Sequence, residues 1–138
     1  MSKKRVGILT SGGDCPGLNA ILYAVLKYAG SLNWDVYGIA NGTDGFIDVA
    51  LGRIDPEDMR IDEHSFDIPG QKGMGVLLFL SGSVLGCRGK KQREPQEDEL
   101  ICQGYQKIQL DVLIAIGGDG SLEIISELAQ KGNWNLVA

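Results

Sequence analysis

The sequence predicts an open α/β fold, in which a mostly parallel sheet carries helices on both faces. Short apolar, β-branched runs alternate along the chain with segments of helical periodicity. This alternation is typical of parallel strands joined by right-handed crossovers. One run, Leu110 to Ile116 (LDVLIAI), is apolar almost throughout, as expected of a central parallel strand that is covered on both faces.

The first half of the chain is predicted to form a strand, a helix and a second strand. Residues 5–10 (RVGILT) form an apolar run that ends in a loop dense in Gly, Asp and Pro, which indicates a buried strand. Apolar residues recur at helical spacing from Leu18 to Ala29, and Gly30 is a natural end for that helix. Residues 35–40 (DVYGIA) are a second strand candidate, which residues 41–45 (NGTDG) follow as a turn.

The middle of the chain has the weakest pattern. Asp55, Pro56 and Glu57 together indicate the start of a short helix that runs toward Arg60. Residues 70–89 are rich in glycine, which favours a strand or an extended loop over a long helix.

The last third is predicted to continue the alternation of helices and strands. Pro95 opens a helix whose acidic residues lie near its start and whose Lys107 lies near its end, as the helix dipole favours. After the strand at Leu110 to Ile116, a helix is expected from about Ser121 to Lys131. Residues 135–138 begin a further strand.

Composition and charge limit the kinds of protein that this chain can be. Its 138 residues, 43% hydrophobic and 22% charged, are enough for one core, so we expect one domain over residues 1–138. The net charge of −5 argues against a nucleic-acid-binding surface, because phosphate backbones are bound mainly by clustered Lys and Arg. The apolar runs Val6 to Leu9 and Val76 to Leu80 are too short for a signal peptide or a membrane span, so we expect a cytoplasmic protein without a membrane partner.

The three cysteines, Cys15, Cys87 and Cys102, are an odd number at wide spacing, and the chain has one histidine. This pattern favours neither a disulfide framework nor a zinc site. We expect reduced thiols with no catalytic role.

Two loops share one design, in which a strand is followed by a glycine-rich turn and then by a helix. The turns are Ser11 to Asp14 (SGGD) and Gly117 to Ser121 (GGDGS). Both would lie at the carboxyl ends of parallel strands, where open α/β sheets bind ligands. Glycine allows the main chain to approach a phosphate closely, and the following helix offers free N–H groups. Each turn is therefore a candidate phosphate site, while a single turn of this kind can equally be tight geometry alone.

Asp119 within the second turn would repel a polyphosphate unless a cation lay between them. Mg²⁺ suits that place, because it binds through a few carboxylates together with phosphate oxygens and water. Neither turn is a Walker A motif, since no Gly-Lys-Ser/Thr follows, and neither has the G-x-G-x-x-G spacing of dinucleotide folds. The pattern thus indicates a phosphate and magnesium site of another type.

These motifs resemble those of a known family. Residues 7–20 (GILTSGGDCPGLNA) closely resemble the opening of the ATP-dependent 6-phosphofructokinases, and residues 116–121 (IGGDGS) resemble their nucleotide and magnesium loop. Residues 82–89 (GSVLGCRG) are a weaker match in the right order. The resemblance covers essentially the whole chain but less than half of a complete member, and it implies the fold of that family's N-terminal domain.

The resemblance also implies a set of site residues. Contacts to ATP would come from Gly12, Arg88, Gly89, Gly118, Asp119, Gly120 and Ser121, with Asp119 as the magnesium ligand. Pyrophosphate-dependent relatives have a similar loop with an Asp at the position of Gly120. A carboxylate there would repel the phosphates of ATP, so by this resemblance the glycine implies ATP as the donor. Thr43 stands where the family often has an aromatic residue against the nucleotide.

The activity implied by the resemblance is the Mg²⁺-dependent transfer of a phosphoryl group from ATP to fructose 6-phosphate, a step of glycolysis. A full-length member of the family would be a homo-oligomer. The family's Thr-Ile-Asp-Asn-Asp segment, whose aspartate acts as the base, should follow the last strand and is absent from the sequence. We therefore expect no catalytic residue in this chain, a base beyond Ala138, and an isolated chain that is inactive.

Two alternatives stay open at this point. NAD and diacylglycerol kinases carry a similar Gly-Gly-Asp-Gly loop, although they lack a motif like that at Leu9 to Asn19. The chain could also be an inactive fragment, or a nucleotide-binding module that completes its site from a partner chain.

Overall fold

The computed structural model describes residues 4–11, 17–39, 42–61, 95–117 and 119–137, with the main chain alone for residues 11, 17–19, 95 and 119–121. Its elements in chain order are β1 (Arg5–Ser11), α1 (Gly17–Ser31), β2 (Asp35–Ile39), α2 (Asp44–Ala50), the 3-10 helix η1 (Pro56–Met59), β3 (Arg60–Ile61), α3 (Pro95–Ile108), β4 (Val112–Gly117), α4 (Asp119–Gly132) and β5 (Leu136–Val137). The strands form one sheet in the order β3-β2-β1-β4-β5. Among the strands of the described residues, only β3 runs antiparallel to its neighbour. The predicted open, mostly parallel α/β fold is confirmed.

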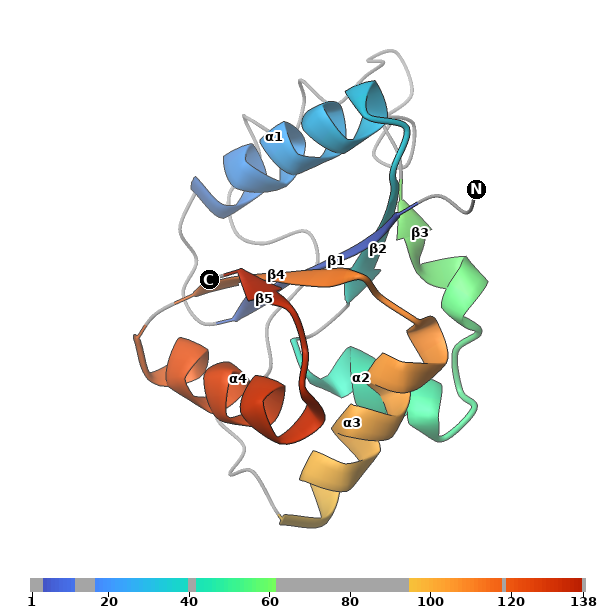
Figure 1. Cartoon of the computed structure of the whole chain (residues 1–138), viewed down its shortest axis with the longest axis vertical. Coiled ribbons are helices and arrows are strands. Elements are labelled where there is room, and N and C mark those ends of the chain that lie inside the picture. Colours follow the sequence, from blue (N-terminus) through green and yellow to red (C-terminus); the bar gives the residue numbers. More distant parts are fainter. Residues whose placement is uncertain (1–3, 12–16, 40–41, 62–94, 118, 138) are drawn as a thin grey trace.

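Helices cover both faces of the sheet (Figure 1). α1 lies on one face, and α2, α3 and α4 lie on the other. β1 is central, and its alternate side chains enter different cores: Ile8 packs with α1 residues, whereas Leu9 packs in the cluster on the opposite face. Both are fully buried. Burial of such a side chain contributes about 1.5–3 kcal/mol to stability. β1 therefore stabilises the packing of helices on both faces of the sheet.

Three elements differ from the sequence-based expectation. α2 occupies Asp44–Ala50, partly within the segment that was expected to be a turn, and it buries Phe46 and Val49. β3 has only two residues, too few for a periodic pattern to indicate a strand. α4 begins at Asp119 rather than at Ser121, so Asp119 and Gly120 belong to its first turn.

The ends of α1 and α4 share one local structure, in which an asparagine with left-handed backbone precedes a tryptophan. The φ angles are 60° at Asn33 and 56° at Asn133. The N–H of Trp34 donates to the carbonyl of Ala29, and that of Trp134 to the carbonyl of Ala129, each at 2.9 Å. Asparagine is among the few residues with a side chain that adopt this conformation readily.

We expect Asn133→Val to lower the free energy of unfolding by about 1–2 kcal/mol, because a β-branched residue is strained at positive φ. Asn133→Gly is the matched control, since glycine adopts the same conformation without strain, and its stability should be close to that of the wild type. Urea unfolding followed by circular dichroism measures both. Equal losses of unfolding free energy in the two variants would show that the asparagine side chain, and not the backbone conformation, stabilises this helix end.

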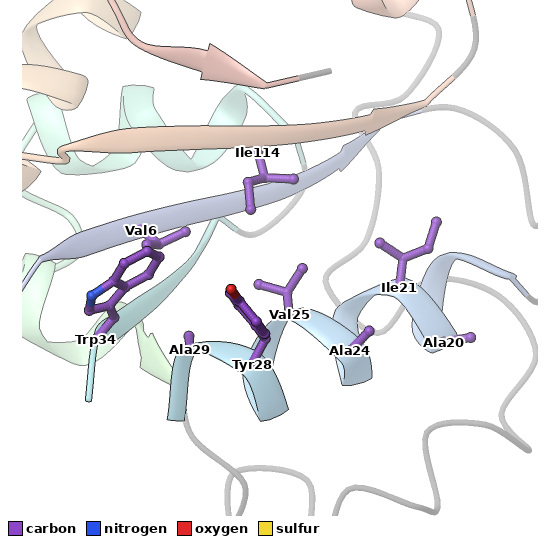
Figure 2. Close-up of a pocket in the computed structure, with 9 residues that line it drawn as sticks. All are labelled: Val6, Ala20, Ile21, Ala24, Val25, Tyr28, Ala29, Trp34 and Ile114. Carbon is purple, nitrogen blue, oxygen red and sulfur yellow. The ribbon is translucent and has the colours of Figure 1, made fainter. Parts of the chain in front are cut away.

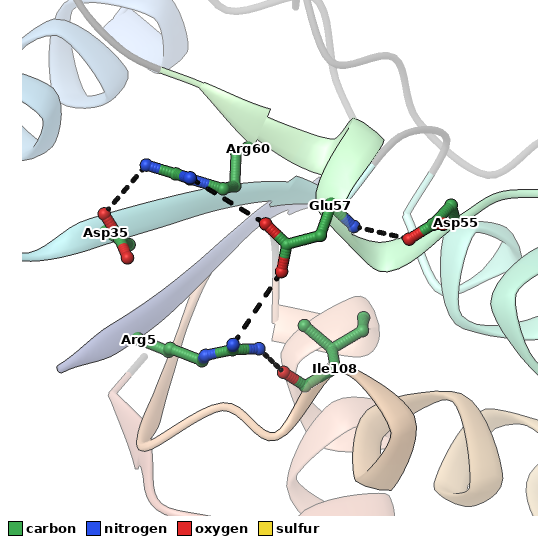
Figure 3. Close-up of polar contacts among 6 residues, drawn as sticks. All are labelled: Arg5, Asp35, Asp55, Glu57, Arg60 and Ile108. Atoms are coloured by element: carbon green, nitrogen blue, oxygen red, sulfur yellow. Dashed lines mark hydrogen bonds and ion pairs between the residues drawn. The ribbon is translucent and has the colours of Figure 1, made fainter. Parts of the chain in front are cut away.

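A network of ion pairs and one hydrogen bond joins five elements, β1, β2, η1, β3 and α3, at the amino-terminal edge of the sheet (Figure 3). Arg5 donates to the carbonyl of Ile108 at 2.8 Å and lies 3.7 Å from Glu57. Arg60 lies 3.8 Å from Glu57 and 3.1 Å from Asp35. Each pair is partly exposed and contributes at most about 1 kcal/mol. The network therefore connects η1, β3 and the end of α3 to the starts of β1 and β2, at the edge opposite to Ser11 and Gly117.

Candidate functional site

The two glycine-rich turns begin side by side. β1 and β4 are parallel neighbours whose paired residues run from Val6↔Val112 to Ser11↔Gly117. The last residues of the two strands, Ser11 and Gly117, are therefore direct partners. Both turns start from this pair of positions, at the carboxyl-terminal edge of the sheet.

This edge is also the place where the strand order reverses. From β1 the chain passes through α1 to β2 on one side, whereas β4 lies on the other side of β1 and leads through α4 to β5. α1 and α4 start at the same edge of the sheet and lie on opposite faces (Figure 1). Open α/β sheets bind their ligands in the crevice outside such a reversal. Sequence patterns alone did not indicate it, because they do not give strand order.

The first turns of two helices supply main-chain donors at this edge. α4 begins with Asp119, Gly120 and Ser121, and the first N–H groups of a helix have no acceptor within it. The positive end of the helix dipole adds to the attraction for an anion. α1 begins at Gly17 on the other face. Gly17 was not among the predicted site residues, although the end of the first glycine-rich loop marks this helix start.

The predicted site residues fall into two groups. The main chain of Asp119, Gly120 and Ser121 forms the start of α4. The others lie outside the described residues: Gly12, Arg88, Gly89 and Gly118. Within the described ranges no group of three or more His, Cys, Asp or Glu is placed to hold a metal ion. The same ranges contain no helix that is both long and apolar enough to cross a membrane.

Two further side chains bear on the sequence predictions. Thr43 follows β2 just before α2, and its exposed fraction is 6%, so it offers little surface to a nucleotide. Cys102 lies in α3, where burial and the nearby Asp98 carboxylate raise the pKa of the thiol. A thiol with a raised pKa is a poor nucleophile at neutral pH.

The sheet and its two helix starts define an open α/β protein of the kind that binds ligands at the carboxyl ends of its strands. Comparison with known families identifies the family within this class. The family model described as phosphofructokinase matches residues 5–138, so the chain belongs to the phosphofructokinase family.

The curated relatives that the chain matches are about three times its length. ATP-dependent 6-phosphofructokinase of Trichormus variabilis is 42% identical over 99% of this chain, which spans 35% of that protein. The protein of the same description from Thermosynechococcus vestitus is 44% identical over 99% of this chain, which spans 34% of it. The chain thus spans about a third of these relatives.

Solved structures agree with the family. The chain superposes on Pichia pastoris phosphofructokinase in the T-state with a TM-score of 0.75 and 26% identity, over 99% of this chain and 15% of that chain. The phosphofructokinase of Saccharomyces cerevisiae gives a TM-score of 0.74 at 22% identity, over 94% of this chain and 16% of that chain. The second likeness concerns the fold alone.

Proposed function

We propose that this chain is the nucleotide-binding region of an ATP-dependent 6-phosphofructokinase. The pairing of Ser11 with Gly117 carries the proposal, because it sets the starts of both motif turns at one edge, where the strand order reverses. A triphosphate has several oxygens to satisfy, and helix starts on opposite faces of the sheet offer N–H donors to it from two directions. The names of the curated relatives support ATP as the donor.

Most of the proposed contacts to ATP come from the two glycine-rich turns. Gly12 and Gly118 lack side chains, which allows the main chain to approach the phosphates. Arg88 and Gly89 would add to the nucleotide site, Arg88 through its charge. Ser121 would bind ATP from the first turn of α4.

Asp119 is the proposed magnesium ligand, because a carboxylate at the start of α4 is the hard oxygen donor that Mg²⁺ takes beside phosphate oxygens. When bound, Mg²⁺ would supply positive charge that offsets the charge of the phosphates. Gly120 would leave the space next to the phosphates free of a second carboxylate.

The chain's own part in the reaction would be to bind and orient ATP, with fructose 6-phosphate as the acceptor of the whole enzyme. Phosphoryl transfer depends mainly on positioning and charge, and a general base adds about 10² to 10⁴-fold. We assign no base to this chain, and we propose that alone it is a binding module without sugar-kinase turnover. Fructose 6-phosphate-dependent ADP formation by the pure chain in a coupled assay would contradict this.

We expect Gly120→Asp to weaken Mg-ATP binding by about 10- to 100-fold, because the new carboxylate would repel the phosphates. Mg-ATP at 100 times its Kd should raise the stability of the wild-type chain by about 2.7 kcal/mol, or roughly 8 °C in Tm. Thermal-shift titration compares the two proteins. An acidic residue in the first turn suits the helix dipole, so the unliganded Tm should not fall.

Asp119→Asn is the companion variant. It keeps the size of the side chain and removes its charge, so it should weaken binding in the presence of Mg²⁺ and have much less effect on binding of ATP in EDTA. The proposal fails if the wild-type chain shows no thermal shift with millimolar Mg-ATP, or if both variants bind as the wild type does.

A further inference from the structure

Helix α1 packs loosely on its face of the sheet. An open hollow of about 590 Å³ lies between α1 and the strands β1 and β4 (Figure 2). Ile21 and Tyr28 of α1 line this hollow, with exposed fractions of 44% and 66%. The described residues that form the buried core under α1 are few and all aliphatic: Ile8, Leu22, Leu26, Ala29 and Val36. α1 therefore gains less stability from burial than the helices on the other face do.

The three helices on the other face are held both by a core and by polar contacts with one another. Their larger core contains buried side chains of α2, α3 and α4 together. Lys107 of α3 donates to the carbonyl of Ala50 in α2 at 3.1 Å. Lys131 of α4 lies 3.1 Å from the carboxylate of Asp98 in α3. These contacts connect α2, α3 and α4 to one another across this face.

The side chains of α1 do not offset its helix dipole. α1 has no acidic residue in its first turn and no basic residue in its last, whereas α3 has Glu97 and Asp98 near its start and Lys107 near its end. The one charged residue of α1, Lys27, lies over the ring of Tyr23 in the same helix, 5.8 Å from the ring centroid. An anion at the start of α1 would supply the stabilising charge that the helix itself lacks.

We propose that α1 is a separate cooperative unit of this chain, which opens while the sheet and the layer of α2, α3 and α4 stay folded. Its opening exposes only the small core beneath it, so it costs less free energy than the unfolding of the whole chain. A nucleotide whose phosphates contact the starts of both α1 and α4 opposes this opening and holds α1 on the sheet. This coupling to the nucleotide rests on the proposed function.

Native-state hydrogen exchange of the 138-residue chain, resolved by peptide with mass spectrometry, tests the proposal. The conditions are those in which the exchange rate of an amide reports its opening equilibrium. After correction for intrinsic rates, we expect the slowest amides of residues 20–31 to exchange at least about 10-fold faster than those of residues 97–108 in α3. Equal rates in the two segments would overturn the proposal, because α1 would then open only when the whole chain unfolds.

Two matched isoleucine variants separate local opening from global unfolding. Ile8→Val shortens a side chain in the core under α1, and Ile125→Val does so in the core on the other face; their exposed fractions are 0% and 2%. Ile125→Val should speed the exchange of residues 97–108 by about 2- to 10-fold and leave that of residues 20–31 unchanged, because the packing of Ile125 survives the opening of α1. Ile8→Val should speed the exchange of both segments. Equal effects of Ile125→Val on the two segments would contradict the proposal.

Mg-ATP at 100 times its Kd separates the coupling from the proposed function. If the nucleotide contacts the starts of both helices, the exchange of residues 20–31 and of residues 97–108 should slow by similar factors, about 100-fold at most. Slower exchange in residues 97–108 alone would show that Mg-ATP binds without the start of α1, which refutes the coupling and leaves the proposed function in place. No change in either segment at millimolar Mg-ATP would refute both the proposed function and the coupling.

Discussion

Gly104→Ala is expected to lower the free energy of unfolding by about 3 kcal/mol, although alanine is the better helix residue. Gly104 lies in α3 where α2 crosses it, and a Cβ there would lie 2.6 Å from the carbonyl carbon of Phe46 and 2.9 Å from its Cα. Overpacking usually costs about 1–3 kcal/mol, and the atoms in the way here belong to main chain, which cannot rotate aside. Denaturant unfolding followed by circular dichroism measures the loss.

Gly30→Ala is the matched control for this prediction. Gly30 lies near the end of α1, and a Cβ there would meet no other atom within 4 Å. The same substitution should therefore raise stability by about 0.5–1 kcal/mol, through the lower backbone entropy of the unfolded chain. Opposite signs at the two glycines are the expected result. A gain at Gly104 as well would mean that α2 and α3 are farther apart than the structure places them.

The second large effect is expected for Phe46→Ala, with a loss of about 3–5 kcal/mol. Phe46 is fully buried in α2, and its ring centroid lies 6.0 Å from that of Tyr105 and 5.7 Å from that of Trp134. Tyr105 and Trp134 are themselves stacked at 4.3 Å. Removing the phenyl ring would leave a cavity where α2, α3 and the end of α4 meet.

Leu51→Ala is the control for Phe46→Ala, because Leu51 is the C-cap residue that follows the same helix and has an exposed fraction of 48%. Its loss should be within about 0.5 kcal/mol. Urea unfolding followed by tryptophan fluorescence reports both variants, since Trp134 is part of the ring cluster. A loss below about 1 kcal/mol for Phe46→Ala would show that the cluster rearranges to fill the space.

Sequence periodicity predicted the longer elements well and the short ones poorly. The helices at α1 and α3 and the strand β1 were predicted within a residue or two, because each has a long apolar repeat or a continuous apolar run. α2 was missed because its start carries Gly and Asp residues that are typical of turns, and its helical form depends on the burial of Phe46 against α3. β3 depends on pairing with β2 and has no local signal.

The site was predicted in part for a related reason. Glycine-rich turns after two strands are visible in the sequence, and the rule for parallel sheets places them at one edge. That Ser11 and Gly117 are direct partners, and that the strand order reverses there, are consequences of tertiary packing that no local pattern contains. The sequence placed the proposed magnesium ligand, Asp119, in a loop, whereas in the structure Asp119 is in the first turn of α4.

The pairing of β1 with β4 also bears on how fast the protein folds. Strand β1, helix α1 and strand β2 are consecutive and can assemble locally, whereas β4 pairs with β1 across α1, β2, α2, η1, β3 and α3 in the sequence. Pairing of residues so far apart in the sequence is slow, because the chain loses entropy before the stabilising contacts form. A ligand that needs both strand ends would recognise only molecules in which this pairing is complete. It would therefore slow unfolding and leave the rate of refolding largely unchanged.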